Sequence, residues 1–104
     1  VRVPTPNVSL VQLSFNSKKK ITKELINNSL IKASNTYLKN ILGIENKPLV
    51  SSDFNHNSKS SIVDVQLTKV IDDNFGTVFS WYDNEWGFSN RMIDVALTLK
   101  NKLK

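Results

Sequence analysis

Hydrophobic residues change their spacing along this chain in an order that leaves few possible folds. They alternate with polar residues over Ser9–Phe15, recur at helical spacing over Thr22–Asn35, and alternate again over Ser61–Ile71 and Phe75–Trp81. Alternation predicts strands, and helical spacing predicts an amphipathic helix. Only the turn Asp72–Asn74 separates the two later strands, so we expect them to form an antiparallel hairpin.

Shorter patterns complete the predicted order of elements. The segment Leu38–Leu42 predicts one more turn of helix, closed by Gly43. A short apolar strand is predicted over Leu49–Ser52. A last helix follows a cap at Ser89 or Asn90 and runs to the end of the chain. Its apolar stripe consists of Phe88, Met92, Ala96, Leu99 and Leu103.

The predicted order is therefore strand, helix, three strands and helix (β-α-β-β-β-α), without the regular alternation of an α/β fold. Such an order favours an α+β fold in which a mixed, mostly antiparallel sheet carries helices on one face. The alternative is a fragment whose sheet is completed by strands outside the chain, in which case exposed edge strands would be a liability.

Composition removes several classes of protein and of site. The 104 residues amount to one small domain, and 39% hydrophobic with 22% charged residues is the balance of a globular chain. There is no cysteine, which excludes disulfides, cysteine zinc sites and thiol nucleophiles. No apolar run reaches the roughly 20 residues of a membrane-spanning helix, so we expect no membrane partner. Because the chain begins at Val1 rather than at Met, we expect a longer gene product.

The net charge of +5 raises nucleic-acid binding as a hypothesis, because basic chains bind phosphates. Lys18–Lys20 lie beside a predicted turn, whereas Lys100, Lys102 and Lys104 lie in the last turn of a predicted helix, where cations favour the helix dipole. We interpret both groups as solvated surface and expect no nucleic-acid partner.

Isolated residues give little evidence of chemistry. His56 is the only histidine and has no cysteine beside it, so no metal site is predicted. A triad of His56, Asp53 and a serine is conceivable, but a loop-bracing role is the commoner one. Arg2 could bind an anion through its planar fork, although an exposed arginine near a chain end often has no such role. The three glycines form neither a dinucleotide fingerprint nor a P-loop.

The segment Ser80–Arg91 differs from the rest because aromatic residues surround polar ones. Two tryptophans and a tyrosine flank three polar residues where a predicted strand meets a predicted helix. Strand ends commonly carry sites, and the amide of Asn84 can both donate and accept, as recognition of another amide requires. The alternative is structural: the aromatic residues are core and the acids cap the last helix.

Three segments together resemble signatures of the phosphorylating glyceraldehyde-3-phosphate dehydrogenases, in that family's order. They are Arg2–Ser9 (RVPTPNVS), Leu49–His56 (LVSSDFNH) and Ser80–Arg91 (SWYDNEWGFSNR). The resemblance covers nearly the whole chain and indicates the C-terminal part of the family's catalytic domain. It implies a mixed, largely antiparallel sheet with helices on one side, in agreement with the prediction from spacing. It also implies a cytoplasmic enzyme that is a homotetramer when full length.

Members of this family oxidise glyceraldehyde 3-phosphate with NAD or NADP and phosphate, giving 1,3-bisphosphoglycerate. By resemblance, Arg2 stands where the family's arginine contacts the substrate phosphate, a task that suits a bidentate guanidinium. Asn84 stands where the family's asparagine holds the nicotinamide carboxamide. Phe88 stands where the family often has a tyrosine near the nicotinamide pocket. The neighbours that match the motif and are interpreted as support for Asn84 are Trp81, Tyr82, Asp83 and Glu85.

The chain also departs from the family's pattern. The family's catalytic cysteine and histidine, and its dinucleotide-binding domain, precede the matched region, so no catalytic residue is predicted here; His56 belongs to the Asp-Phe-Asn loop. Asn35–Tyr37 and Asn40 stand where relatives often have a Gly-Pro turn and a glycine. We therefore expect part of an oxidoreductase that is inactive alone. The alternative is a non-enzymatic remnant that acts as a binding or assembly module.

Overall fold

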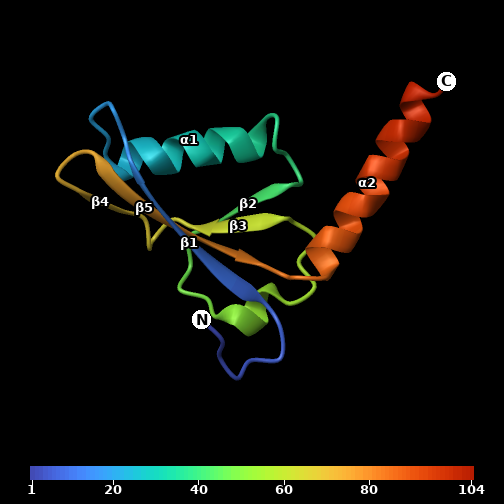
Figure 1. Cartoon of the computed structure of the whole chain (residues 1–104), viewed down its shortest axis with the longest axis horizontal. Helices are drawn as coiled ribbons and strands as arrows, with labels where there is room; N and C mark the ends of the chain where they lie inside the picture. Colours follow the sequence, from blue (N-terminus) through green and yellow to red (C-terminus); the bar gives the residue numbers. More distant parts are fainter.

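The computed structural model describes all residues, 1–104, and contains five strands, two α-helices and one short 3-10 helix (Figure 1). In chain order the elements are β1 (Ser9–Asn16), α1 (Lys23–Asn35), β2 (Leu42–Glu45), the 3-10 helix η1 (Ser51–Phe54), β3 (Ser61–Asp64), β4 (Lys69–Ile71), β5 (Phe75–Tyr82) and α2 (Trp86–Lys102).

The strands form one mixed sheet in the order β1-β5-β3-β2, and β4 also pairs with β5. β1 and β5 are antiparallel over their whole length, from Ser9 opposite Tyr82 to Asn16 opposite Phe75. β5 is also antiparallel to β3 and β4, whereas β2 and β3 are parallel. The predicted α+β class and the mixed, mostly antiparallel sheet are confirmed, with one more strand than the spacing of hydrophobic residues indicated.

Helix α1 begins where the sequence indicates and covers one face of the sheet (Figure 1). The hydroxyl of Thr22 accepts a hydrogen bond from the Leu25 N–H at 3.1 Å, so the predicted N-cap is confirmed. Ala33 of this helix packs on Leu42 and Val63, from β2 and β3. One apolar cluster therefore joins α1 to the parallel pair of strands.

A second apolar cluster lies on the other face of the sheet. The side chains of Ile62 and Val63 point to opposite faces of the sheet, because they are neighbours in strand β3. Ile62 packs with Val8 and Phe54. The Phe54 ring stacks on Trp81 of β5, with ring centroids 5.3 Å apart. This cluster fixes the segment before β1 and the 3-10 helix beneath the end of β5.

The helix predicted over Leu38–Leu42 is wrong, because residues 36–41 form turns and no helix. Leu42 opens strand β2, and Gly43 lies within that strand rather than closing a helix. Asn40 supplies the left-handed residue instead, with φ 67°, a conformation that asparagine tolerates better than most residues.

Two strand predictions also need correction. Leu49–Ser52 forms no strand; Ser51–Phe54 is a 3-10 helix in which the Asp53 carboxylate accepts a hydrogen bond from the Val50 N–H. The strand predicted over Ser61–Ile71 is divided into β3 and β4 by a turn. The predicted hairpin is confirmed for β4 and β5, whose turn contains Asp72 and Asp73 with positive φ.

Helix α2 leaves the end of β5 and projects away from the sheet (Figure 1). Its predicted apolar stripe exists, but the stripe is exposed: Phe88 keeps 66% and Met92 59% of its accessible surface. Only Gly87 of this helix is buried. Neither helix of the structure is long and apolar enough to cross a membrane.

Candidate functional site

The junction of β5 and α2 carries the aromatic and polar segment that the sequence singled out. The predicted caps Ser89 and Asn90 are wrong, because both residues lie inside α2. Oδ1 of Asp83 accepts hydrogen bonds from the N–H groups of Glu85, at 3.1 Å, and Trp86, at 2.9 Å. The helix therefore begins earlier than predicted, because a carboxylate just before it satisfies the first free N–H groups.

Asp83 also binds two segments that are remote in sequence. Its Oδ2 accepts hydrogen bonds from the backbone N–H of His56, at 2.9 Å, and from Nδ2 of Asn7, at 2.8 Å. The residue is only 2% exposed, so a charged carboxylate is buried with four donors around it. These contacts join the entry segment, the loop after η1 and the start of α2 at one point.

The electrostatics of Asp83 follow from these contacts. Burial acts to raise the pKa of the carboxyl group, because it disfavours the charged form. Hydrogen bonds from the N–H groups of Trp86, His56 and Glu85, and from the Asn7 amide, outweigh burial and hold the pKa of Asp83 below its usual value. The junction is therefore organised around a carboxylate that stays ionised at neutral pH.

Asn84 is exposed beside this buried carboxylate. Its Oδ1 accepts a hydrogen bond from the hydroxyl of Ser9 at 2.9 Å. Ser9 reaches it because the first residue of β1 pairs with Tyr82, the last residue of β5. The structure thus presents the amide of Asn84 to solvent on a loop whose backbone is fixed by Asp83.

An unusual backbone conformation lies next to these contacts. Val8 has φ 76°, which is an outlier for a β-branched residue. Its side chain is buried against Phe54 and Ile62, and this packing holds the strained conformation in place. The bend at Val8 lies between Asn7, which binds Asp83, and Ser9, which binds Asn84.

The other two predicted site residues are exposed and form no hydrogen bond with Asn84. Arg2 lies on the N-terminal segment before β1 and takes part in neither of the two ion pairs of the chain. Phe88 lies in the first turn of α2 with an exposed ring. None of Arg2, Asn84 and Phe88 lines the hollow between α1 and β4 or the one beside β2 and the 3-10 helix.

His56 does not form the conceivable triad with Asp53. The Asp53 carboxylate accepts the Val50 N–H instead, and the His56 ring lies against Trp86 with ring centroids 4.5 Å apart. The backbone of His56 has positive φ, and its N–H binds Asp83. No three histidine, cysteine or acidic side chains gather as metal ligands would.

The start of α2 is also fixed by close packing on the loop before β3. A Cβ atom at Gly87 would lie 2.8 Å from the carbonyl oxygen of Lys59, so glycine permits this approach. One turn further on, Nη1 of Arg91 donates hydrogen bonds to the Ser60 hydroxyl and the Asn40 carbonyl, both at 3.3 Å. The orientation of α2 therefore depends on its first two turns.

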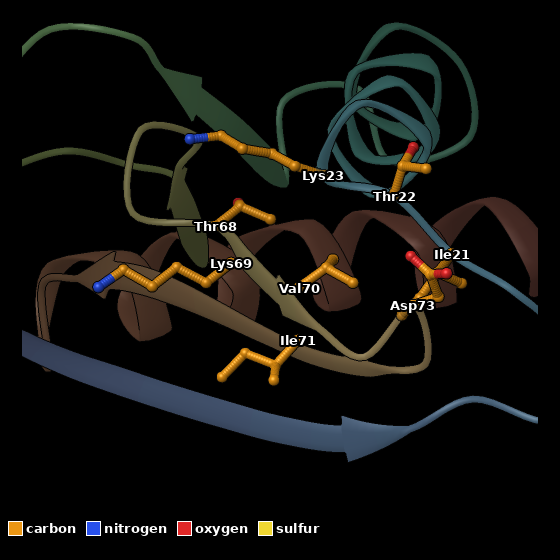
Figure 2. A pocket seen from close by; sticks show the side chains of 8 residues that line it. All are labelled: Ile21, Thr22, Lys23, Thr68, Lys69, Val70, Ile71 and Asp73. Atoms are coloured by element: carbon orange, nitrogen blue, oxygen red, sulfur yellow. The ribbon is translucent and has the colours of Figure 1, made fainter.

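A further hollow of the structure lies elsewhere, near the other end of β5. It is open, has a volume of about 520 Å³ and lies between the start of α1 and strand β4 (Figure 2). Its lining includes Lys23 and Lys69, and Thr68, whose buried hydroxyl has no hydrogen-bond partner. None of the predicted site residues lines it.

Sequence reasoning assigned a supporting role to Asp83 but missed its partner Asn7, and it missed Ser9, the partner of Asn84. A carboxylate one turn before a helix is a recognisable capping signal, which the sequence offered. The contacts to Asn7 and His56 have no such signal, because they join segments that only the folded sheet brings together.

Comparison with known proteins gives one consistent result. A family model described as the C-terminal domain of glyceraldehyde 3-phosphate dehydrogenase matches residues 1–84. A glyceraldehyde-3-phosphate dehydrogenase of Xanthobacter flavus is 52% identical over 99 residues, which cover 95% of this chain and 30% of that protein. The chromosomal glyceraldehyde-3-phosphate dehydrogenase of Cupriavidus necator is 54% identical over 99 residues, 95% of this chain and 29% of the relative. The chain thus spans about 30% of the length of these relatives.

Proposed function

The chain belongs to the glyceraldehyde-3-phosphate dehydrogenase family, and on that premise we propose that it forms the C-terminal part of a longer oxidoreductase subunit. The complete subunit uses NAD or NADP and phosphate to oxidise glyceraldehyde 3-phosphate to 1,3-bisphosphoglycerate. In it, this chain contributes Asn84 to the nicotinamide carboxamide and Arg2 to the phosphate of the substrate. The family resemblance extends the proposal to a cytoplasmic homotetramer.

The observation that carries this proposal is the contrast between Asp83 and Asn84. Asp83 is buried and accepts four hydrogen bonds, while the next side chain, that of Asn84, is exposed. A residue that selects the orientation of a ligand needs a fixed backbone and an accessible polar group, because a mobile group gives no orientation. The junction provides both features at adjacent positions.

The chemistry is divided between this chain and the rest of the subunit. The nicotinamide, when bound, accepts hydride, and an amide that holds its carboxamide determines which face of the ring is presented to the substrate. Asn84 can hold a carboxamide because its side chain carries both donors and an acceptor. This chain has no cysteine, so a thiol nucleophile has to come from the remainder of the subunit.

Arg2 and Phe88 have supporting parts in the proposal. The guanidinium of Arg2 is exposed and has no carboxylate partner, so it is free to bind a phosphate through paired N–H groups. Phe88 presents an apolar ring four residues after Asn84, at the start of α2, where it can line the nicotinamide side of a site completed by the rest of the subunit.

The test is the variant Asn84→Ala in the complete subunit, followed by steady-state kinetics with varied dinucleotide. We expect a higher KM for the dinucleotide or a lower kcat, with little change in the KM for glyceraldehyde 3-phosphate. The matched control is Asn28→Ala, which removes an exposed asparagine amide from α1. Kinetics that are identical in Asn84→Ala and the wild type would remove Asn84 from the site.

A non-enzymatic assembly module is the second candidate, and the exposed apolar face of α2 favours it. The two candidates differ in what they require of the gene that encodes this chain. Finding a dinucleotide-binding domain and a cysteine nucleophile encoded upstream of Val1 would support the dehydrogenase. Dehydrogenase activity of the isolated chain with glyceraldehyde 3-phosphate, phosphate and dinucleotide would contradict both, because neither assigns it a nucleophile.

A further inference from the structure

The hydrogen bond between Ser9 and Asn84 fixes the direction of an exposed amide. The Ser9 hydroxyl donates to Oδ1 of Asn84 at 2.9 Å, while Nδ2 of Asn84 has no partner within the chain. An amide group is planar, so a hydrogen bond to its oxygen also sets the direction of its two N–H groups. Asn84 therefore offers donors to a ligand, and its oxygen is already engaged.

The backbones that carry the two residues are held independently of this bond. Ser9 is the first paired residue of β1 and lies opposite Tyr82. On the other side, Asp83 fixes the loop through the N–H groups of Glu85 and Trp86 and through Asn7. Loss of the Ser9 hydroxyl would thus leave the position of Asn84 intact and free only the rotation of its amide.

We propose that Ser9 is a positioning residue that turns the amide nitrogen of Asn84 toward the carbonyl oxygen of the nicotinamide carboxamide. This inference rests on the proposed function, since it deepens the role of Asn84. The proposed hydrogen bond has one direction: Nδ2 of Asn84 donates, and the carbonyl oxygen of the ligand accepts. Without the Ser9 hydroxyl, the amide populates the flipped orientation, in which its oxygen faces the carbonyl oxygen of the ligand.

The first experiment measures dissociation constants of the complete subunit for the dinucleotide that it uses. Ser9→Ala should weaken binding by about threefold to tenfold, the usual net worth of one hydrogen bond. Ser9→Thr keeps a hydroxyl and should stay within about twofold of the wild type. The same dinucleotide without its nicotinamide, an adenosine diphosphoribose, should bind all variants equally, which separates orientation of the amide from damage to the fold.

A second ligand tests the direction of the hydrogen bond between Asn84 and the carboxamide. The acetylpyridine analogue of the dinucleotide keeps the carbonyl oxygen but has a methyl group in place of the amide nitrogen. If Nδ2 of Asn84 donates to that oxygen, Ser9→Ala weakens binding of the analogue and of the natural dinucleotide by the same factor. A loss confined to the natural dinucleotide would mean that Asn84 acts through its oxygen, and the proposal would be overturned.

A double-variant comparison separates this inference from the proposed function. In Asn84→Ala, the added change Ser9→Ala should have no further effect on dinucleotide affinity, because the oriented group is gone. If Asn84→Ala weakens binding and Ser9→Ala does not, only the role of Ser9 fails. If Asn84→Ala itself leaves affinity unchanged, both the role of Ser9 and the assignment of Asn84 fail.

Discussion

Nδ2 of Asn7 donates a hydrogen bond to Oδ2 of Asp83 across 2.8 Å, although 76 positions separate the two residues in sequence. The contact joins the segment before β1 to the loop after β5, which lie at the same end of the longest strand pair in the sheet. Because Asp83 also holds the His56 N–H and the start of α2, a single carboxylate determines how three segments meet.

Asp83→Asn should destabilise the fold by about 2 to 3 kcal/mol, because hydrogen bonds to a charged group are lost and an amide N–H faces other donors. The measurement is the free energy of unfolding in urea at pH 7. Asp72→Asn is the matched control, since Asp72 is exposed in a turn with φ 52° and asparagine tolerates that backbone. Equal free energies for the two variants would contradict the role of Asp83.

The lowered pKa of Asp83 predicts a pH dependence of stability. The folded-state pKa lies below the usual value of 3.8, so the unfolded chain binds a proton more readily than the folded one. The stabilisation by this group is therefore present above pH 3.8 and is lost as the pH falls through 3.8 and below. Urea unfolding from pH 7 to pH 3 should show the difference between wild type and Asp83→Asn shrinking on acidification; a constant difference would refute the prediction.

Much of the fold could be predicted because its signals are local. Strand β1, helix α1 and the β4–β5 hairpin each show their own periodicity, cap or turn, and each appears where expected. Thr22 illustrates the point, since its side chain needs only the next three residues to form its cap.

The rest depended on contacts between remote segments. The four residues of β2 form a strand because β3 lies parallel to them, from Leu42 opposite Ser61 to Glu45 opposite Asp64. A short apolar run alone does not distinguish such a strand from a turn of helix. The same applies to the candidate site: the motif around Asn84 was visible, whereas its contact with Ser9 required the pairing of β1 with β5.

Gly87→Ala should loosen the start of α2. The new methyl group would meet the Lys59 carbonyl at 2.8 Å, and backbone cannot move aside as a flexible side chain can. We expect a loss of about 1 to 3 kcal/mol in the free energy of unfolding, despite the higher helix propensity of alanine. Ser89→Ala, at an exposed position of the same helix, is the control and should change stability little. A gain in stability for Gly87→Ala would show that the contact is not close in solution.

The exposed apolar face of α2 should contribute almost nothing to the stability of this chain. Met92→Gln should change the free energy of unfolding by less than about 0.5 kcal/mol, because Met92 is 59% exposed. Ile62→Ala, at a site only 3% exposed, should cost about 2 to 4 kcal/mol. Comparable losses would mean that α2 folds back onto the sheet in solution.

Arg2→Ala in the complete subunit should distinguish phosphate recognition from a structural role. If Arg2 binds the substrate phosphate, kcat/KM for glyceraldehyde 3-phosphate should fall by about tenfold or more, since charge-assisted hydrogen bonds are worth roughly 1.5 to 3 kcal/mol. Unphosphorylated glyceraldehyde offers no phosphate, so its kcat/KM should change little. Arg2→Lys keeps the charge but loses the planar fork and should fall between the two. Equal losses with both aldehydes would make Arg2 structural, whereas a selective loss would place this exposed side chain in the substrate site.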